Sequence, residues 1–475
     1  MLSSKYILSI KNPSYSDLKK TLADALARIE NLTKEFESMR QELNSAKIEI
    51  STLKTELAIY KNPKNSNNSS IPPSKDENRV KKNQSLREKS GKKSGGQPGH
   101  QGNTLAMVSV PDQIIRHLPQ ICDHCGKDLS SIEPVFAGKR QVIEIPPIKP
   151  VYVQHETYQR QCSCGKVCEG SFPGHLKAPV QYGDSVANLV SYFSARHYLP
   201  FQRSCEIFGH VFNIPISEGS IANLVQATAD KLYPYYLQIK GRVENSNALG
   251  ADETGAKING KKGWFWTWQD RLHTFIAVSM SRGEKVREEH FLKGFPDAIL
   301  NSDAYPVHLS TPCKGHQLCI AHLLRELNYF IEIYPCNQWP QKLKALFKDA
   351  LGLKANMATQ DYDHCPKRDK LSKTLNGLLK NPPAPKGKLL AFYKRMVKNQ
   401  KSLFTFLYYP EVSPDNNASE RGIRNVKVKQ KVSGQFKSMA GAQNFAIIRS
   451  VIDTYIKKNL KILESLSKLP NLAPE

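Results

Sequence analysis

The sequence predicts a multidomain protein of mixed α+β structure. Its 475 residues exceed the length of one ordinary domain and leave room for two to four folded units. An apolar heptad repeat fills the first sixty positions, and strand-like stretches alternate with helical ones in the second half. Apolar residues make up 40% of the chain and charged residues 23%, which are globular values and exclude wholesale disorder.

The charge balance indicates a polyanionic partner. Lys and Arg total 68 against 43 Asp and Glu, a net charge of +25, and nucleic acid is the commonest polyanion. No run of about 18 apolar residues could span a bilayer, and the first eleven residues lack the apolar core of a signal peptide. We therefore expect a cytoplasmic protein with no membrane partner.

Residues 1–60 are predicted to form a coiled-coil helix. Apolar residues from Tyr15 to Tyr60 recur at alternating steps of three and four, which is the pattern of a heptad seam. So narrow a stripe suits pairing with identical helices better than packing on a globular body. We expect a homo-oligomer, with a helix packed back on its own chain as the alternative.

Residues 61–104 are predicted to be a disordered basic linker. They are rich in Asn, Ser, Pro, Lys and Gly, with ten basic and three acidic residues. The stretch Arg79–Lys93 either contacts DNA phosphates or is a solvated spacer, and the composition allows both.

Residues 105–180 are predicted to be a zinc ribbon. Two short glycine-flanked turns carry the cysteines, which are Cys122, Cys125, Cys162 and Cys164. Four thiolates would complete the tetrahedron around one structural Zn²⁺, although Cys168 could replace a member of the second pair. Between the turns, Gln141–Ile145 and Val151–Tyr158 alternate as strands do. Unpaired reduced cysteines are the alternative.

Residues 181–240 are predicted to be helical, with a turn near Asn213–Ser217 and a helix cap at Ser217 or Ser220. A DNA-binding helix-turn-helix and a plain helical connector both remain open, because two helices and a turn are common.

After residue 240 the pattern changes to strands. Three stretches separated by short polar turns, Ala248–Thr254, Gly263–Trp268 and His273–Ser279, predict an antiparallel meander. A helical stretch near Glu284–Phe295 and a short strand, Ala298–Leu300, follow.

Three acids stand out in this region. Asp252 lies in the first strand, Asp303 follows the fourth, and Glu420 lies in a helix that Asp415 can cap. An acid in an apolar strand is costly to bury unless it is paired or binds a cation. Carboxylates favour Mg²⁺ or Mn²⁺, and two such ions can catalyse phosphoryl transfer. Taken singly, each acid could equally be a solvated or ion-paired carboxylate.

The helix that begins near Asn416 is predicted to hold DNA against these acids. Asn416 and Asn417 share a face with Glu420, and a basic row lies beside them. The residues of that row are Arg421, Arg424 and Lys427. A solvated helix face is the alternative.

Three further patterns have competing interpretations. Glu253 should face away from Asp252 and have a structural role. The alternating tryptophans at 264, 266 and 268 fit a packed core better than base stacking. Cysteine and histidine recur every three residues from Cys313 to His322, but we expect no second zinc site, because Cys319 in a strand and His322 at a helix start should point apart.

Many motifs occur in an order typical of one family. They are Asn-Ser-Ser-Ile-Pro-Pro-Ser (68–74), Gly-Gly-Gln-Pro-Gly-His-Gln-Gly (95–102), Ala-Pro-Val-Gln-Tyr-Gly (178–183), Asp-Glu-Thr (252–254), Gly-Trp-Phe-Trp (263–266), Ser-Asp-Ala-Tyr (302–305), Cys-Ile-Ala-His-Leu-Leu-Arg (319–325) and Asn-Asn-Ala-Ser-Glu-Arg (416–421). With the heptad helix and the cysteine turns, they make the chain resemble the DDE transposases of the insertion sequence 66 family. Ile456–Leu460 departs from the family in lacking a glycine-containing turn.

The resemblance implies an RNase H-like catalytic domain over 241–440, with a helical insertion at about 323–405 and C-terminal helices over 441–475. It implies that Asp252, Asp303 and Glu420 are the metal-binding acids. It also places His322 and Arg325 beside the active site, in contact with DNA.

The implied function is a transposase that binds the ends of its mobile element, cuts DNA and joins the freed 3′-hydroxyl to target DNA, with two Mg²⁺ or Mn²⁺ per site. A transposase of this kind would work with small accessory proteins of the same element. It would associate with the bacterial nucleoid. The alternatives are a non-catalytic DNA-binding zinc-ribbon protein, as an inactive relic would be, and a host repair nuclease.

Overall fold

The computed structural model describes residues 14–65, 68–69, 76–77, 99, 105–358, 362–384 and 387–468. The predicted phosphate-binding stretch Arg79–Lys93 lies outside them. The chain has a mixed α+β fold and divides into two compact units. One unit comprises residues 1–79, 191–199 and 225–475, and the other comprises residues 80–190 and 200–224.

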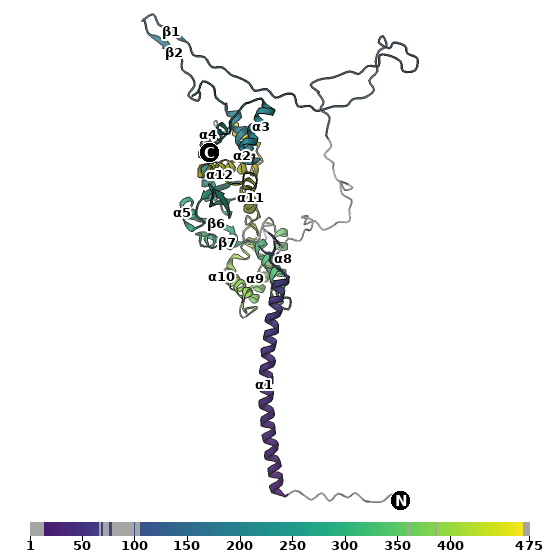
Figure 1. Ribbon diagram of the computed structural model, residues 1–475, viewed down its shortest axis with the longest axis vertical. Helices are drawn as coiled ribbons and strands as arrows, with labels where there is room; N and C mark the ends of the chain where they lie inside the picture. Colours follow the sequence, from purple (N-terminus) through teal and green to yellow (C-terminus); the bar gives the residue numbers. More distant parts are fainter. Residues whose placement is uncertain are drawn as a thin grey trace. The chain divides into compact units, whose positions relative to one another are not determined.

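Helix α1 (Tyr15–Lys61) forms the predicted heptad segment (Figure 1). It begins with a capping box, in which Ser14 and Asp17 satisfy each other's backbone N–H groups. No residue of α1 is buried, and seam residues such as Leu18 and Leu43 are more than half exposed. Only the end of the helix, at Ala58 and Ile59, packs against the core beneath α7 (Ile320–Ile333). The seam is thus an unpaired apolar stripe within the described residues.

The first residues of the predicted linker are folded, which corrects the expectation of disorder there. Asn68 is 1% exposed, and its side-chain amide donates to Glu332 on α7 at 2.6 Å. Ser69 is also buried and donates to the carbonyl of Asn65 at 2.6 Å. Composition predicted solvation, but a hydrogen bond to α7 compensates the burial of the Asn68 amide, and a bond to Asn65 compensates that of the Ser69 hydroxyl.

In the second unit, residues 105–180 have little regular structure. The predicted strands at 141–145 and 151–158 do not form, and the apolar side chains there are exposed. A short antiparallel hairpin, β1 (Gln159–Gln161) with β2 (Val167–Glu169), spans the second cysteine turn. With so few apolar contacts, this segment has no core to hold longer strands together.

The predicted helical region is present as α2 (Asp184–Arg196), α3 (Phe201–Phe212) and α4 (Glu218–Glu244). The turn lies at the expected place, with Asn213 in the left-handed conformation and the Ser217 hydroxyl accepting from the Ser220 N–H at 3.0 Å. These observations confirm the helices, the turn and the Ser217 cap.

A five-stranded mixed sheet forms the centre of the first unit. Its order is β5-β4-β3-β6-β7, where β3, β4 and β5 are antiparallel neighbours and β6 and β7 run parallel to β3. The bounds are β3 (Ala248–Ile258), β4 (Lys261–Gln269), β5 (Thr274–Ser279), β6 (Phe295–Ser302) and β7 (Cys313–Leu318). The predicted meander is confirmed, and two of the three tryptophans, Trp266 and Trp268, are buried in the core.

Helices cover and extend this sheet. Figure 1 marks α11 and α12 beside it, and α12 is tied to β5 because the Thr454 and Ser450 hydroxyls accept from the N–H groups of Thr274 and Ile276. Helix α12 therefore belongs to the sheet's own core. The remaining helices are α5 (Glu284–His290), α6 (Pro306–Ser310), α8 (Trp339–Asn356), α9 (Pro366–Leu378), α10 (Lys388–Lys398), α11 (Asn417–Ser433), α12 (Met439–Lys457) and α13 (Ile462–Lys468).

Helices α7 to α10 share one apolar core with the 3₁₀ turns at Gln400–Ser402 and Thr405–Leu407. Side chains such as Leu327, Phe347 and Phe406 are fully buried in it. This helical layer occupies the predicted insertion and begins slightly earlier, at Ile320. None of the described helices combines the length and apolarity needed to cross a bilayer.

Candidate active site

The sheet register places two of the predicted acids side by side. In the parallel pair β3–β6, Leu249 is opposite Leu300 and Gly250 is opposite Asn301. Continuing this register by two residues sets Asp252 level with Asp303, which follows the last residue of β6. Neighbouring strands are about 4.8 Å apart, so two carboxylates in one row share a single site.

The segment before α11 brings the third acid to this site across 117 positions of sequence. Asn301 at the end of β6 donates its amide to the carbonyls of Ser413 (2.7 Å) and Asp415 (2.9 Å). The N–H of Ile320, at the start of α7, donates to Pro414 at 3.0 Å. These bonds fix where α11 begins, and Glu420 lies in its first turn. Asp415 accepts from the Asn417 N–H at 3.0 Å, but the N-cap position of α11 is Asn416, one residue after the predicted cap.

Close packing seats α11 on β3. Asn416 is buried and donates its side-chain amide to the Ala251 carbonyl at 2.6 Å. Gly250 leaves the space, because a Cβ there would lie 2.4 Å from Ser419 Oγ and 2.5 Å from Asn416 Oδ1. Asn416 therefore holds the helix to the sheet, and its burial argues against the predicted contact with DNA.

Asp252 is a partly buried acid without a cationic partner among the described residues. Its carboxylate accepts one bond, from the N–H of Glu253 at 2.9 Å. Burial, reinforced by the negative charges of Glu253, Asp303 and Glu420, raises the pKa of Asp252 well above its usual value. The negative charges of Asp303 and Glu420 both contribute to this pKa shift, so both acids lie close enough to act on Asp252, and a cation bound beside it would relieve the repulsion.

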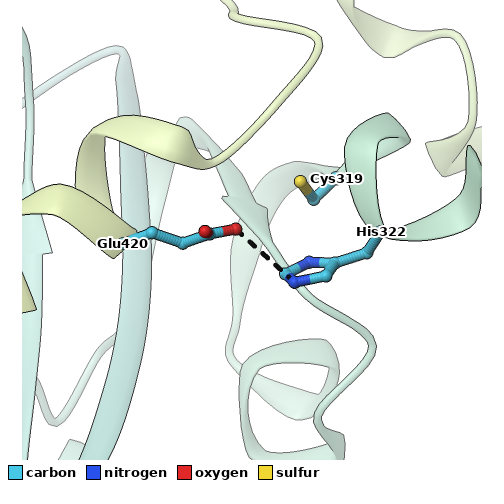
Figure 2. A group of neighbouring side chains, drawn as sticks. All are labelled: Cys319, His322 and Glu420. Atoms are coloured by element: carbon cyan, nitrogen blue, oxygen red, sulfur yellow. Dashed lines mark ion pairs between the residues drawn. The ribbon is translucent and has the colours of Figure 1, made fainter. Parts of the chain in front are cut away.

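Glu420 is surrounded by three basic side chains, of which Figure 2 shows His322. His322 Nε2 and Arg325 Nη2 each lie 3.4 Å from one of its oxygens, and Arg424 Nη2 lies 3.5 Å from the other. The placement of His322 and Arg325 beside the acids agrees with the sequence expectation. Burial and the Arg325 charge lower the pKa of His322, which favours the neutral imidazole.

Cys319 and His322 converge, whereas the sequence led us to expect that they point apart. Cys319 caps α7 and His322 lies in its first turn, so their side chains and Glu420 come within 4.8 Å of one another (Figure 2). Burial raises the pKa of Cys319 to about 11, and a thiol that keeps its proton is a poor zinc ligand. Cys313 and His316 instead contact each other on β7, 3.3 Å apart.

Glu253 is held by a cage of its own, as expected of a structural residue. Its side chain is 3% exposed, bonded to His308 Nε2 at 2.8 Å and to Arg282 Nη2 at 2.5 Å. These partners lower the pKa of Glu253 despite its burial. Arg282 stacks on the Tyr305 ring, and the Tyr305 N–H donates to Asp303 at 2.9 Å. The cage thereby links the strand of Asp252 to the loop of Asp303, a connection without a sequence signal.

The basic row on α11 is exposed as predicted. Arg421, Arg424 and Lys427 all face solvent at least in part, and Asn417 beside them is half-buried. Arg424 reaches back to Glu420, and the Lys427 ammonium donates to the Gly255 carbonyl of β3. Arg421 is the member of the row whose charge has no such recorded contact within the described chain.

The predicted zinc ligands form two separate turns. In each turn the glycine N–H donates to the carbonyl of the first cysteine at 2.8 Å, and Gly126 and Gly165 adopt positive φ. Backbone N–H groups lower the pKa of Cys122 and of Cys162, which prepares both for thiolate chemistry. Within the described residues the two pairs are not gathered into one cluster.

Two family models match the chain. The model described as Transposase IS66 family matches residues 179–444, more than half of the sequence. A family of unknown function, DUF6444, matches residues 10–106, which include α1. No curated protein matches the chain.

Proposed function

This chain belongs to the IS66 family of transposases, and from that premise we propose that it is an active DDE transposase with an RNase H-like catalytic domain. The observation that supports it best is that the sheet register sets Asp252 level with Asp303, while Glu420 lies close enough for its charge to raise the pKa of Asp252. The sheet order, with a meander followed by two parallel strands, is consistent with that fold. A DNA-binding protein has no need for three mutually repelling acids.

The residues of the site suit divalent metal ions. All three donors are hard carboxylate oxygens, the ligand type that Mg²⁺ and Mn²⁺ prefer. Asp252 is partly buried with no cation beside it among the described residues, and its raised pKa reflects an uncompensated charge. Two bound Mg²⁺ or Mn²⁺ would activate the attacking oxygen and stabilise the leaving one in phosphoryl transfer.

The chain's own residues would align the reactants. Asp252 and Asp303, fixed in one row of the sheet, set the position of the scissile phosphate. Water attacks the phosphorus, breaks the P–O3′ bond, and leaves a 3′-hydroxyl and a 5′-phosphate. The 3′-hydroxyl then attacks a phosphate of the target, and the broken P–O3′ bond of the target strand releases the target's own 3′-hydroxyl. Arg325 and Arg424 beside Glu420 would hold the non-reacting phosphate oxygens, a role that guanidinium groups perform in bidentate fashion.

Other parts of the chain would bring DNA and protomers together. We assign the binding of double-stranded transposon ends to the zinc ribbon together with α3 and the start of α4. We assign the binding of target DNA to the basic row of α11. The unpaired seam of α1 would form a homo-oligomer, as synapsis of two ends requires. The DNA substrate places the protein with the bacterial nucleoid in the cytoplasm, where accessory proteins of the element would join it.

The proposal is tested with purified full-length chain, Mg²⁺ and linear DNA that carries both ends of the encoding element. We expect new 3′-hydroxyl ends and strand-transfer products. Tight binding without either product would instead favour a non-catalytic relic, and cleavage indifferent to the end sequence would favour a nuclease.

A further inference from the structure

A cavity of about 260 Å³ opens beside Asp303. Its lining comes from the loop of Asp303 and Tyr305, from one face of α7, and from α10 in the helical insertion. The α7 face contributes His322, Leu323 and Glu326, which recur at helical spacing. The cavity therefore begins at a catalytic acid and ends in the insertion.

The far end of the cavity presents a donor and an acceptor side by side. Arg395 of α10 donates from Nη2 to both oxygens of Glu326, each at 2.7 Å. Both side chains are about one-third exposed. Neither Arg395 Nε nor His322 Nδ1 has a hydrogen-bond partner among the described residues, although both atoms are buried. Leu323, 2% exposed, is an apolar member of the same lining.

This combination of features matches a nucleobase. A flat heterocycle needs an apolar or aromatic surface for its face and paired donors and acceptors for its edge. Cavities for drug-sized ligands begin at about 300 Å³, so 260 Å³ suits one base and excludes a length of strand. The base nearest the scissile phosphate is the part of the substrate that could reach a cavity opening at Asp303.

We propose that this cavity binds the base of a nucleotide next to the scissile phosphate, turned out of the DNA stack. Arg395 and Glu326 would contact its edge, and Tyr305 and His322 would contribute aromatic surface at the mouth. The inference rests on the proposed function, because it takes the phosphate position from the three acids. It adds that the helical insertion contributes to the active site directly.

The experiment uses full-length protein and element-end DNA with 2-aminopurine at either nucleotide flanking the cleavage position. In Ca²⁺, which permits binding without cleavage, we expect a several-fold rise in fluorescence at one of these positions and none at a position five nucleotides away. Arg395→Ala should abolish the rise and slow cleavage in Mg²⁺ at least tenfold. Lys394→Ala removes one charge from the exposed face of the same helix and should change neither.

An abasic site at the responding position removes the need to unstack a base, so it should restore cleavage by Arg395→Ala toward the wild-type rate. If Arg395→Ala does not fold, Glu326→Gln is the substitute test. It keeps the size of the side chain and should lower the fluorescence rise. Wild-type cleavage without any fluorescence rise, or a full rise with Arg395→Ala, would overturn the base site alone. Wild-type protein that binds DNA but never cleaves it would refute the proposed function and this site together.

Discussion

Gly250 offers a sharp test of how α11 is seated on the sheet, because its missing side chain leaves room for two atoms of that helix. In Gly250→Ala the new methyl would lie 2.4 Å from Ser419 Oγ and 2.5 Å from Asn416 Oδ1. Ordinary contact begins at 3.4 Å, so the start of α11 must move outward by about 1 Å. Glu420 lies one residue beyond Ser419 and moves with it.

The expected effects differ for folding and for catalysis. Overpacking of this kind lowers the free energy of unfolding by about 1–3 kcal/mol, which leaves a folded protein. A displacement of about 1 Å at a catalytic group costs on the order of 100-fold in rate. We therefore expect cleavage to fall by about two orders of magnitude, while the dissociation constant for element-end DNA stays near the wild-type value.

Gly255→Ala is the matched control, because it adds the same methyl to the same strand but meets no atom closer than 3.6 Å. It should leave the cleavage rate close to wild type. Adding Ser419→Ala to Gly250→Ala removes one of the two crowded atoms and should recover part of the rate. Equal rates in Gly250→Ala and Gly255→Ala would show that α11 does not rest on β3 as described.

Three further predictions concern other parts of the chain. Elemental analysis should find one zinc per chain, lost on combined replacement of Cys122 and Cys162 by Ser; zinc-free protein with reduced cysteines would refute the ribbon. Deleting residues 14–54, which spares the docked end of α1, should lower the mass measured by light scattering to that of one protomer, and an unchanged mass would place assembly elsewhere. Glu253→Gln should lower the free energy of unfolding by about 1–3 kcal/mol, because His308 and Arg282 lose a charged acceptor in a buried cage. Urea titration measures this loss of stability, and an unshifted unfolding midpoint would contradict the structural role of Glu253.

The sequence predicted the sheet well because its strands are marked locally. Ala248–Thr254 and Gly263–Trp268 are short apolar or alternating runs between polar turns, and such patterns depend only on neighbouring residues. Asp252 and Asp303 stood out for the same reason, since one interrupts an apolar strand and the other ends one, whereas Glu420 lies in a polar helix and its role came from the family resemblance. What periodicity could not supply was the register that sets Asp252 level with Asp303.

The features that sequence analysis missed are long-range contacts. Asn68 looks like a linker residue until Glu332, 264 positions later, provides its partner. Cys319 and His322 converge because the β7–α7 turn comes directly after the strand, whereas a strand-based alternation would separate them. Arg395 lies in an ordinary amphipathic helix, and only the packing of α10 against α7 brings it to the cavity beside Asp303.

The central claim, that three acids form one metal-dependent active site, is tested most directly by Asp303→Asn. This change keeps the size of the side chain and an acceptor for the Tyr305 N–H but removes one negative charge from the site. The measurement is cleavage and strand transfer on element-end DNA in Mg²⁺, with DNA binding measured on the same preparation. We expect binding within about twofold of wild type and loss of both products, with the same split for Asp252→Asn and Glu420→Gln. Normal strand transfer by Asp303→Asn would contradict the three-acid site.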